Sequence, residues 1–333
     1  MNKLTKLGVS ALCGSLAAVA SANAGALTAS GGADLTWISN DDEQTGNPLG
    51  MGSNWALDGS GELDNGWTVA MGIAFKNSDV YSATNVTVTI PAIGDIKITS
   101  GVSGTGIDRM DDVTPNVWEE AYASGLSTGI NTVAGASGGQ GIEYTPNMTP
   151  DGLTARVSYA ASSDGAIADK AAGGTTTSGT GWDVTLVATD ALHGITGLEV
   201  GGGISEVAYN GLNRDGDREE QTAYVTYAIG GFTLGYQWSE EDLGISANEQ
   251  QYDNEGYGIT FAINDDLSIG YNNYESKQTS TTNVTAEAES IQLSYSYGGA
   301  SFRIMQASAD NMDYNTNATQ DRDNTVISLG LAF

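Results

Sequence analysis

Apolar and polar residues alternate in short stretches along almost the whole chain, with the period of two that marks a β-strand with one apolar face. Residues 325–333 show the pattern clearly, because their odd positions carry Thr, Ile, Leu, Leu and Phe, and their even positions carry Val, Ser, Gly and Ala. We find no sustained helical period of 3.6 residues after residue 24. The pattern therefore predicts an all-β protein.

The alternating stretches number sixteen, and a closed single-chain barrel usually has an even number of strands. We expect strands at residues 27–38, 52–63, 67–76, 82–90, 95–102, 139–145, 153–161, 181–188, 197–208, 220–229, 232–239, 252–263, 267–275, 286–297, 300–309 and 322–333. Tight turns such as 64–66 and 230–231 mostly alternate with long polar loops. That alternation is typical of a membrane barrel whose two ends face different compartments. The pattern predicts a closed antiparallel transmembrane β-barrel.

The apolar residues of each predicted strand define its lipid-facing side, which places the charged residues. All five bases within strands fall on the opposite, lumen-facing side: Lys76, Lys97, Arg156, Arg303 and Arg322. A base that faced lipid near mid-bilayer would cost about 2–4 kcal/mol. One group of acids shares this lumen-facing parity: Asp34, Asp58, Glu62, Glu143, Asp183, Glu199 and Glu220.

A second group of acids breaks the parity, and its members all lie near the long-loop ends of strands: Glu206, Asp253, Glu255, Glu275, Glu287, Glu289 and Asp323. We expect the strands to project beyond the bilayer there, so that these acids meet water. A β-bulge after residues 201–203 is a second explanation for Glu206.

The N-terminus has the features of a secretory signal peptide at residues 1–24, followed by the barrel at 25–333. Lys3 and Lys6 precede an apolar run too short to span a bilayer, and a small-x-small cleavage pattern follows at 22–24. The only cysteine, Cys13, lies inside this segment. We therefore expect a mature chain without disulfides, a cysteine nucleophile or a cysteine metal site.

The chain is strongly acidic, with 41 Asp and Glu against 12 Lys and Arg. Such a charge repels nucleic acid, which binds to basic patches. It attracts cations, and divalent ions would be needed beside anionic lipid headgroups. The same charge is also compatible with an acidic secreted protein.

One connection, about 36 residues from Ser103 to Gly138, is much longer than the others. Connections of this length in compact folds are usually functional. Thr114 followed by Pro115 predicts the start of a short helix with Glu119 and Glu120 near its beginning. The connection also carries acids ahead of this point, at 108, 111 and 112.

In its strand count, its long third loop and its terminal aromatic Phe333, the chain resembles the general diffusion porins of Gram-negative outer membranes. The resemblance covers the whole mature chain but rests on architecture and on no long motif. It implies a sixteen-stranded, usually trimeric barrel among outer-membrane lipid and lipopolysaccharide. Its third loop would fold into the lumen and narrow the passage for small polar solutes and ions.

The resemblance also assigns the two sides of the constriction. The acidic side would be formed by Asp108, Asp111, Asp112, Glu119 and Glu120. The basic side would be formed by Lys76, Lys97, Arg156 and Arg303. Family members often carry more bases there, so we expect a preference for cations.

Other chemistry is weakly supported. The acidic loop segments offer calcium candidates at Asp41, Asp42, Asp215 and Asp217, without full EF-hand spacing. The single histidine, His193, lies in a predicted turn, which does not suit a hydrolase triad. We therefore predict no enzyme activity and no cofactor beyond possible calcium or other divalent cations.

The sequence thus predicts a passive outer-membrane channel for small hydrophilic solutes. Two alternatives stay open at this point. One is a soluble, secreted, acidic β-protein that binds calcium, of the adhesin or surface-layer type. The other is a substrate-specific outer-membrane channel.

Overall fold

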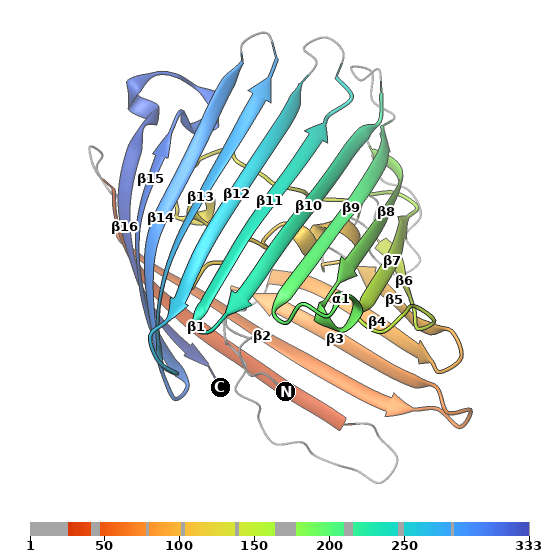
Figure 1. Ribbon diagram of the computed structural model, residues 1–333. Coiled ribbons are helices and arrows are strands. Elements are labelled where there is room, and N and C mark those ends of the chain that lie inside the picture. Colours follow the sequence, from red (N-terminus) through yellow and green to blue (C-terminus); the bar gives the residue numbers. More distant parts are fainter. Residues whose placement is uncertain are drawn as a thin grey trace.

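A computed structural model describes residues 26–40, 47–77, 80–100, 104–136, 140–163, 178–209, 216–245, 250–280 and 283–332. The predicted signal peptide and Phe333 lie outside these ranges. The described chain forms sixteen strands (Figure 1): β1 (Ala26–Asn40), β2 (Leu49–Glu62), β3 (Thr68–Lys76), β4 (Val80–Ile90), β5 (Gly94–Ser100), β6 (Gln140–Pro146), β7 (Leu153–Ala160), β8 (Ser178–Ala188), β9 (Leu198–Tyr209), β10 (Arg218–Ile229), β11 (Phe232–Asp242), β12 (Gln251–Ala262), β13 (Leu267–Thr279), β14 (Val284–Tyr297), β15 (Ala300–Asp310) and β16 (Arg322–Ala332).

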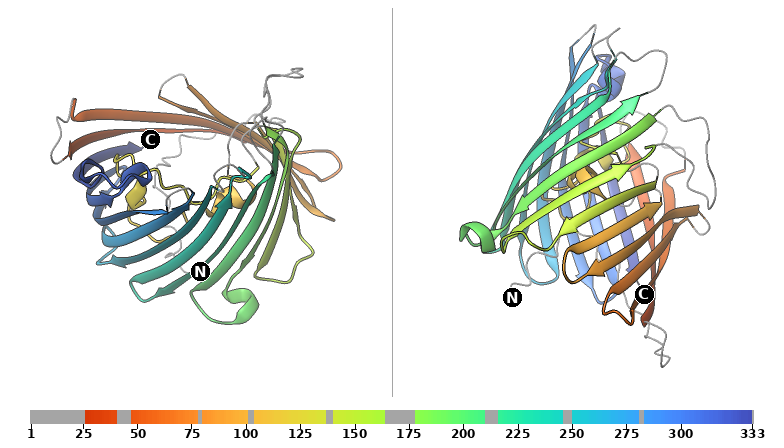
Figure 2. Two further views of the ribbon diagram at one scale, coloured as in Figure 1. Left: turned by 90° about the horizontal axis from the view of Figure 1, so that it is seen from above. Right: turned by 90° about the vertical axis from the view of Figure 1, so that its right-hand side faces the viewer.

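The sheet closes on itself, because each strand pairs with its neighbours in the chain and β1 pairs with β16 (Figure 2). In the closing antiparallel ladder Leu35 lies opposite Leu329, and Trp37 lies opposite Ile327. The hydrocarbon core of a membrane offers no hydrogen-bond partners to unpaired backbone groups. A closed barrel meets this condition because it has no edge strand. The predicted fold class is confirmed, and every predicted strand end lies within four residues of the observed one.

The two faces of the sheet differ as the alternation predicts. Large apolar side chains such as Leu35, Ile204 and Ile291 are exposed on the outside. Polar side chains such as Gln237 and Gln292 are buried on the inside. So extensive an exposed apolar surface marks a membrane protein and contradicts the soluble alternative.

The predicted bulge in β9 is wrong. Gly201–Glu206 pairs without interruption against Glu219–Tyr224 of β10. Ser205 and Val207 are buried inside the barrel, so Glu206 faces outward by ordinary alternation. The register shift in this region instead lies in β8, between Ser178 and Gly181.

Most connections at one end of the barrel are tight, and one contains the short helix α1 (Asp190–His193). The Nδ1 atom of His193 accepts a hydrogen bond from the backbone N–H of Ile195 at 3.2 Å, as expected for a turn residue. Of the helices that the structure describes, none has the length and apolar character needed to cross a bilayer.

Candidate functional site: the loop inside the barrel

The connection between β5 and β6 runs through the interior of the barrel (Figures 1 and 2). Its described part, residues 104–136, contains two short 3₁₀ helices, η1 (Gly106–Met110) and η2 (Ala121–Ala123). The η1 helix contacts β7–β10, and η2 contacts β13–β15. The loop therefore spans the lumen from one part of the wall to another.

The expected helix start at Thr114 and Pro115 is wrong. Residues 113–120 are not helical, and Glu120 precedes η2 with an extended backbone. Pro115 lies directly against the wall: a Cβ atom at Gly235 would come within 2.3 Å of its Cδ atom, and one at Gly258 within 2.2 Å of its carbonyl oxygen. Packing against two wall glycines, rather than local helix propensity, therefore sets the conformation here.

The first anchor of the loop is Glu143 of β6. Its carboxylate accepts a hydrogen bond from the backbone N–H of Gly106 at 2.7 Å and pairs with the guanidinium of Arg109. Gly106 has a φ of +58°, and a Cβ atom there would lie 2.0 Å from the carboxylate of Asp183. Only glycine fits this close approach with a left-handed backbone.

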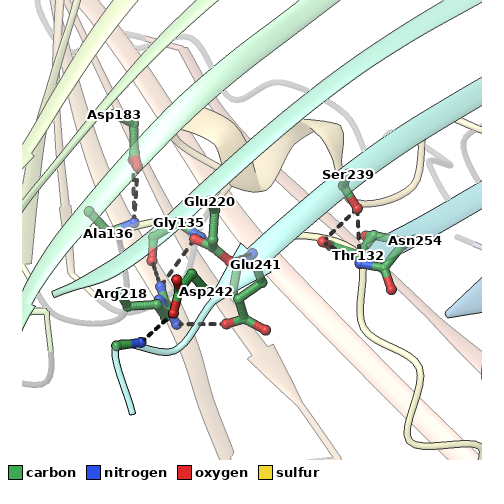
Figure 3. Close-up of polar contacts among 12 residues, drawn as sticks. Thr132, Gly135, Ala136, Asp183, Arg218, Glu220, Ser239, Glu241, Asp242 and Asn254 are labelled. Atoms are coloured by element: carbon green, nitrogen blue, oxygen red, sulfur yellow. Dashed lines mark hydrogen bonds and ion pairs between the residues drawn. The ribbon is translucent and has the colours of Figure 1, made fainter. Parts of the chain in front are cut away.

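The returning arm of the loop is bound by two further wall carboxylates (Figure 3). Glu220 accepts hydrogen bonds from the backbone N–H groups of Ala134 at 2.8 Å and Gly135 at 2.7 Å. Asp183 accepts one from Ala136 at 3.2 Å. Carboxylates that accept backbone N–H bonds in a buried setting are strong anchors. Cross-strand register places Glu143, Asp183 and Glu220 in one inward row around the wall.

Arg218 completes this anchor (Figure 3). Its guanidinium donates to the carbonyl oxygen of Gly135 and forms ion pairs with Glu220 at 3.3 Å and Glu241 at 3.9 Å. Nearby, the carbonyl oxygen of Thr132 accepts a hydrogen bond from the Ser239 hydroxyl at 2.9 Å. The arm is thus fixed mainly through its backbone, and its close approach requires glycine at 135, where φ is +69° and a Cβ atom would lie 2.8 Å from Ile107.

The middle of the loop is held against the far wall by amide side chains. Gln292 of β14 accepts a hydrogen bond from the N–H of Trp118 at 3.0 Å and donates to the carbonyl oxygen of Glu119. Asn324 of β16 donates to the carbonyl oxygen of Ser124 at 2.8 Å. An apolar cluster supports this contact, formed by Ala121, Leu126, Ile130, Tyr274, Ala286, Ala288, Ala309 and Met312.

The five predicted acids lie close enough together to influence one another. Burial, then the neighbouring Asp112 and Asp108, raise the pKa of Asp111 to about 8. Burial, and then the charges of Glu119 and Asp112, raise the pKa of Glu120 to about 7, although Asn116 donates to its carboxylate at 2.6 Å.

The outer members of the cluster follow the same trend. Burial raises the pKa of Asp108, with a further contribution from Asp112. Burial also raises the pKa of Glu119, against the opposing effect of Arg303. The loop therefore carries a crowded acidic group, in which burial raises the pKa of four members.

The predicted bases do not form a single wall. Lys97 and Arg156 interact electrostatically with Arg109 and Glu143 near the start of the loop. Arg303 lies elsewhere, in an ion pair with Asp34 at 2.9 Å and 5.2 Å from the ring centre of Trp118.

Lys76, at the end of β3, shows no contact with the acidic group among the described residues. The structure thus brings Lys97 and Arg156 together and separates Arg303 and Lys76 from them.

Sequence reasoning missed the role of the wall acids and of Arg109. Alternation correctly places Glu143, Asp183 and Glu220 in the lumen, but it gives no indication that they bind the loop backbone. The glycine at 106 and the Gly135-Ala136 pair were available signals, because small residues allow backbone to approach a wall closely.

The calcium candidates gain no support from the structure. Asp41, Asp42 and Asp215 lie outside the described residues. The carboxylate of Asp217 accepts a hydrogen bond from the backbone N–H of Tyr209 at 3.3 Å. Within the described ranges, no three His, Cys, Asp or Glu side chains are grouped so as to hold a metal ion.

A family profile described as Gram-negative porin matches residues 8–301. No curated protein matches the chain. Among solved structures, the chain is similar to Salmonella typhi OmpF in complex with daunomycin, with a TM-score of 0.69, 12% identity, and coverage of 93% of this chain and 98% of the other.

Two further structures agree. OmpT of Vibrio cholerae gives a TM-score of 0.66 and 13% identity over 95% of this chain and 100% of the other. A refined porin structure gives a TM-score of 0.64 and 14% identity, with coverage of 92% of this chain and 100% of the other. At these identities the structural matches support the barrel fold alone.

Proposed function

The chain belongs to the family of Gram-negative porins and is an outer-membrane diffusion channel; we propose that it passes small hydrophilic solutes and ions with a preference for cations. The observation that carries the preference is the imbalance of charge at the loop. Arg109, Arg218 and Arg303 each form an ion pair with a wall carboxylate. The loop acids Asp111 and Glu120 interact mainly with other acids.

The balance of these charges favours cations in the passage beside the loop. The electrostatic field of an ion pair is weak at a distance because the two charges cancel, whereas the fields of several neighbouring carboxylates add together. Lys97 and Arg156 oppose this field only near the start of the loop, where Glu143 lies among them. Polar solutes would cross between these charged groups without shedding all their water.

A cysteine at Asp112 tests this assignment, since Cys13 is the only native cysteine and lies in the predicted signal peptide. Asp112 is exposed within the loop. In a planar bilayer, a cationic thiol reagent should react with Asp112→Cys faster than an anionic reagent of similar size. Each reaction should lower single-channel conductance in a discrete step. Equal rates, or no change in conductance, would count against an acidic constriction at this loop.

Two further parts of the proposal, the oligomeric state and the absence of covalent chemistry, are based on membership of the porin family. We propose a homotrimer that performs no covalent chemistry, and loop-bound divalent cations stay a prediction. Light scattering of the detergent-extracted protein would distinguish a trimer from a monomer. Uptake of sugars of increasing size into liposomes would distinguish a general diffusion channel from a substrate-specific one, which would saturate.

A further inference from the structure

The outer face of β12–β15 carries a feature that a lipid-facing wall does not require. Cross-strand register places Glu255, Glu275, Glu287 and Asp310 directly opposite one another across four consecutive strands. Directly opposed side chains have Cβ atoms roughly 5 Å apart, and like charges in such pairs are destabilising. In β12–β15, the only outward-facing base is Lys277. Lys277 lies one outward position from the row, opposite Asp253, so the row itself holds four acids and no base.

An apolar hollow lies immediately beside this row, toward the middle of the membrane. Its volume is about 410 Å³, and its lining includes Val225, Leu234, Tyr236, Tyr257, Ile259 and Tyr271. The hollow has the size of ordinary ligand pockets, which span roughly 300–1,000 Å³. Because it opens on the lipid-facing side of the barrel, its occupant comes from the membrane.

Polar groups join the hollow to the carboxylates. The Tyr271 hydroxyl donates to Glu289 at 2.7 Å, which extends the acidic group down to the edge of the hollow. Asn273 lies between the hollow and the carboxylates, directly opposite Tyr257 of β12 on one side and Glu289 of β14 on the other. Its Nδ2 atom donates to Glu287 at 2.7 Å.

The Oδ1 atom of Asn273 is left without a hydrogen-bond partner, although this side chain is only 2% exposed. A buried polar atom without a partner is costly, and its presence in a native protein calls for an explanation such as a bound water or ion. The orphaned atom is an acceptor, and its neighbours are carboxylates. A donor with positive charge would complement this acceptor and the neighbouring carboxylates better than a water molecule would.

We propose that this face binds a membrane lipid whose headgroup carries a primary ammonium, with an acyl chain in the hollow. An ammonium has three N–H donors. It matches the Oδ1 atom of Asn273 together with the carboxylates of Glu287 and Glu289. A phosphate lipid bridged by a divalent ion fits less well, because no three described acids are grouped for a metal.

The test compares lipids that share acyl chains and differ in the headgroup. Purified protein in an uncharged maltoside detergent is mixed with phosphatidylethanolamine, phosphatidylcholine or phosphatidylglycerol, and bound lipid is counted by native mass spectrometry. The ethanolamine lipid should bind about tenfold more tightly than the choline lipid, which lacks N–H donors. Equal binding of all three would overturn the proposal. So would preferential binding of the glycerol lipid that EDTA abolishes, because that result indicates a metal bridge.

Two substitutions locate the site. Glu287→Gln should remove most of the preference for the ethanolamine lipid, whereas Glu206→Gln, an outward acid outside the row, should leave it unchanged. Ile259→Trp, which fills the hollow, should weaken binding, and Ile204→Trp on β9 is its matched control. Heat-modified gel migration confirms that each variant is folded. If the preference survives both Glu287→Gln and Ile259→Trp, the lipid binds elsewhere and the proposal is wrong. The headgroup comparison on the unaltered protein does not depend on any variant.

Discussion

Two groups of carboxylates inside the same barrel are in opposite physical states. The wall acids Glu143, Asp183 and Glu220 each accept hydrogen bonds from the loop backbone, and two of them also pair with an arginine. The charges that act on the loop acids Asp111 and Glu120 are mainly those of other acids. The first group binds the backbone of the loop, whereas the role we propose for the second group is to give the passage its field. On this proposal, identical side chains serve structure in one place and ion passage in the other.

The largest expected effect comes from the wall. Glu220→Ala removes the acceptor for two backbone N–H groups and an ion-pair partner of the partly buried Arg218. We expect a loss of about 3 kcal/mol in the free energy of unfolding, measured by urea titration with gel migration as readout. Single channels should also become noisier as the returning arm loosens. The control Asp112→Ala, on the exposed part of the loop, should change stability by about 0.5 kcal/mol or less. Equal effects of the two variants would remove the distinction between the groups.

Removing two carboxylate charges from the loop should have the next largest effect. We expect this effect on ion selectivity and not on stability. At pH 9 the double variant Asp111→Asn/Glu120→Gln should lower the cation-to-anion permeability ratio about fivefold. The reason is that unit charges a few ångströms from a permeating ion each contribute on the order of 1 kcal/mol even in water. Asp253→Asn, on the outer face, is the matched control and should not change the ratio. A ratio unaffected by the double variant would place the selective charges elsewhere.

An effect on selectivity of similar size to that of the double variant is expected from a change of pH. The folded-state pKa of Asp111 is about 8 and that of Glu120 about 7, both above their ordinary values of 3.8 and 4.5. Between pH 4 and 8 the folded protein therefore binds more protons than the unfolded chain, so this contribution to stability falls as pH rises through that window.

Cation preference should change in the opposite sense and rise by up to about fivefold between pH 6 and 9, because ionisation adds the same two charges that the double variant removes. Reversal potentials measured across this range check the prediction. The double variant should flatten the profile, and a wild-type profile that is already flat would contradict the pKa assignments.

The smallest effect is expected at the basic group near the start of the loop. Lys97→Glu should raise cation preference by about twofold or less, because Glu143 already offsets part of the lysine charge. Lys277→Glu makes the same change on the outer face and should leave selectivity unaltered. If Lys97→Glu instead weakens cation preference, the lysine does not face the passage.

Alternation predicted the barrel well because each strand has one lipid-facing and one lumen-facing side, and lipid tolerates no exception near its middle. The inward positions of Arg303 and Glu143 follow from that rule.

The path of the loop could not be predicted in the same way. Contacts such as that of Glu220 with Gly135 join residues 85 positions apart through a backbone N–H, which has no side-chain signature. The helix expected at Thr114 failed for a related reason, since packing of Pro115 on two wall glycines overrides local propensity. Local signals describe strands that pack on lipid, but they do not describe a segment that folds into its own barrel.

The central claim is that an acidic loop, fixed by wall carboxylates, makes the passage favour cations. The zero-current potential of single channels in a tenfold potassium chloride gradient at pH 9 tests it most directly. The account predicts a potential whose sign shows that potassium permeates more readily than chloride. A potential of zero, or one of the sign set by chloride, would contradict it.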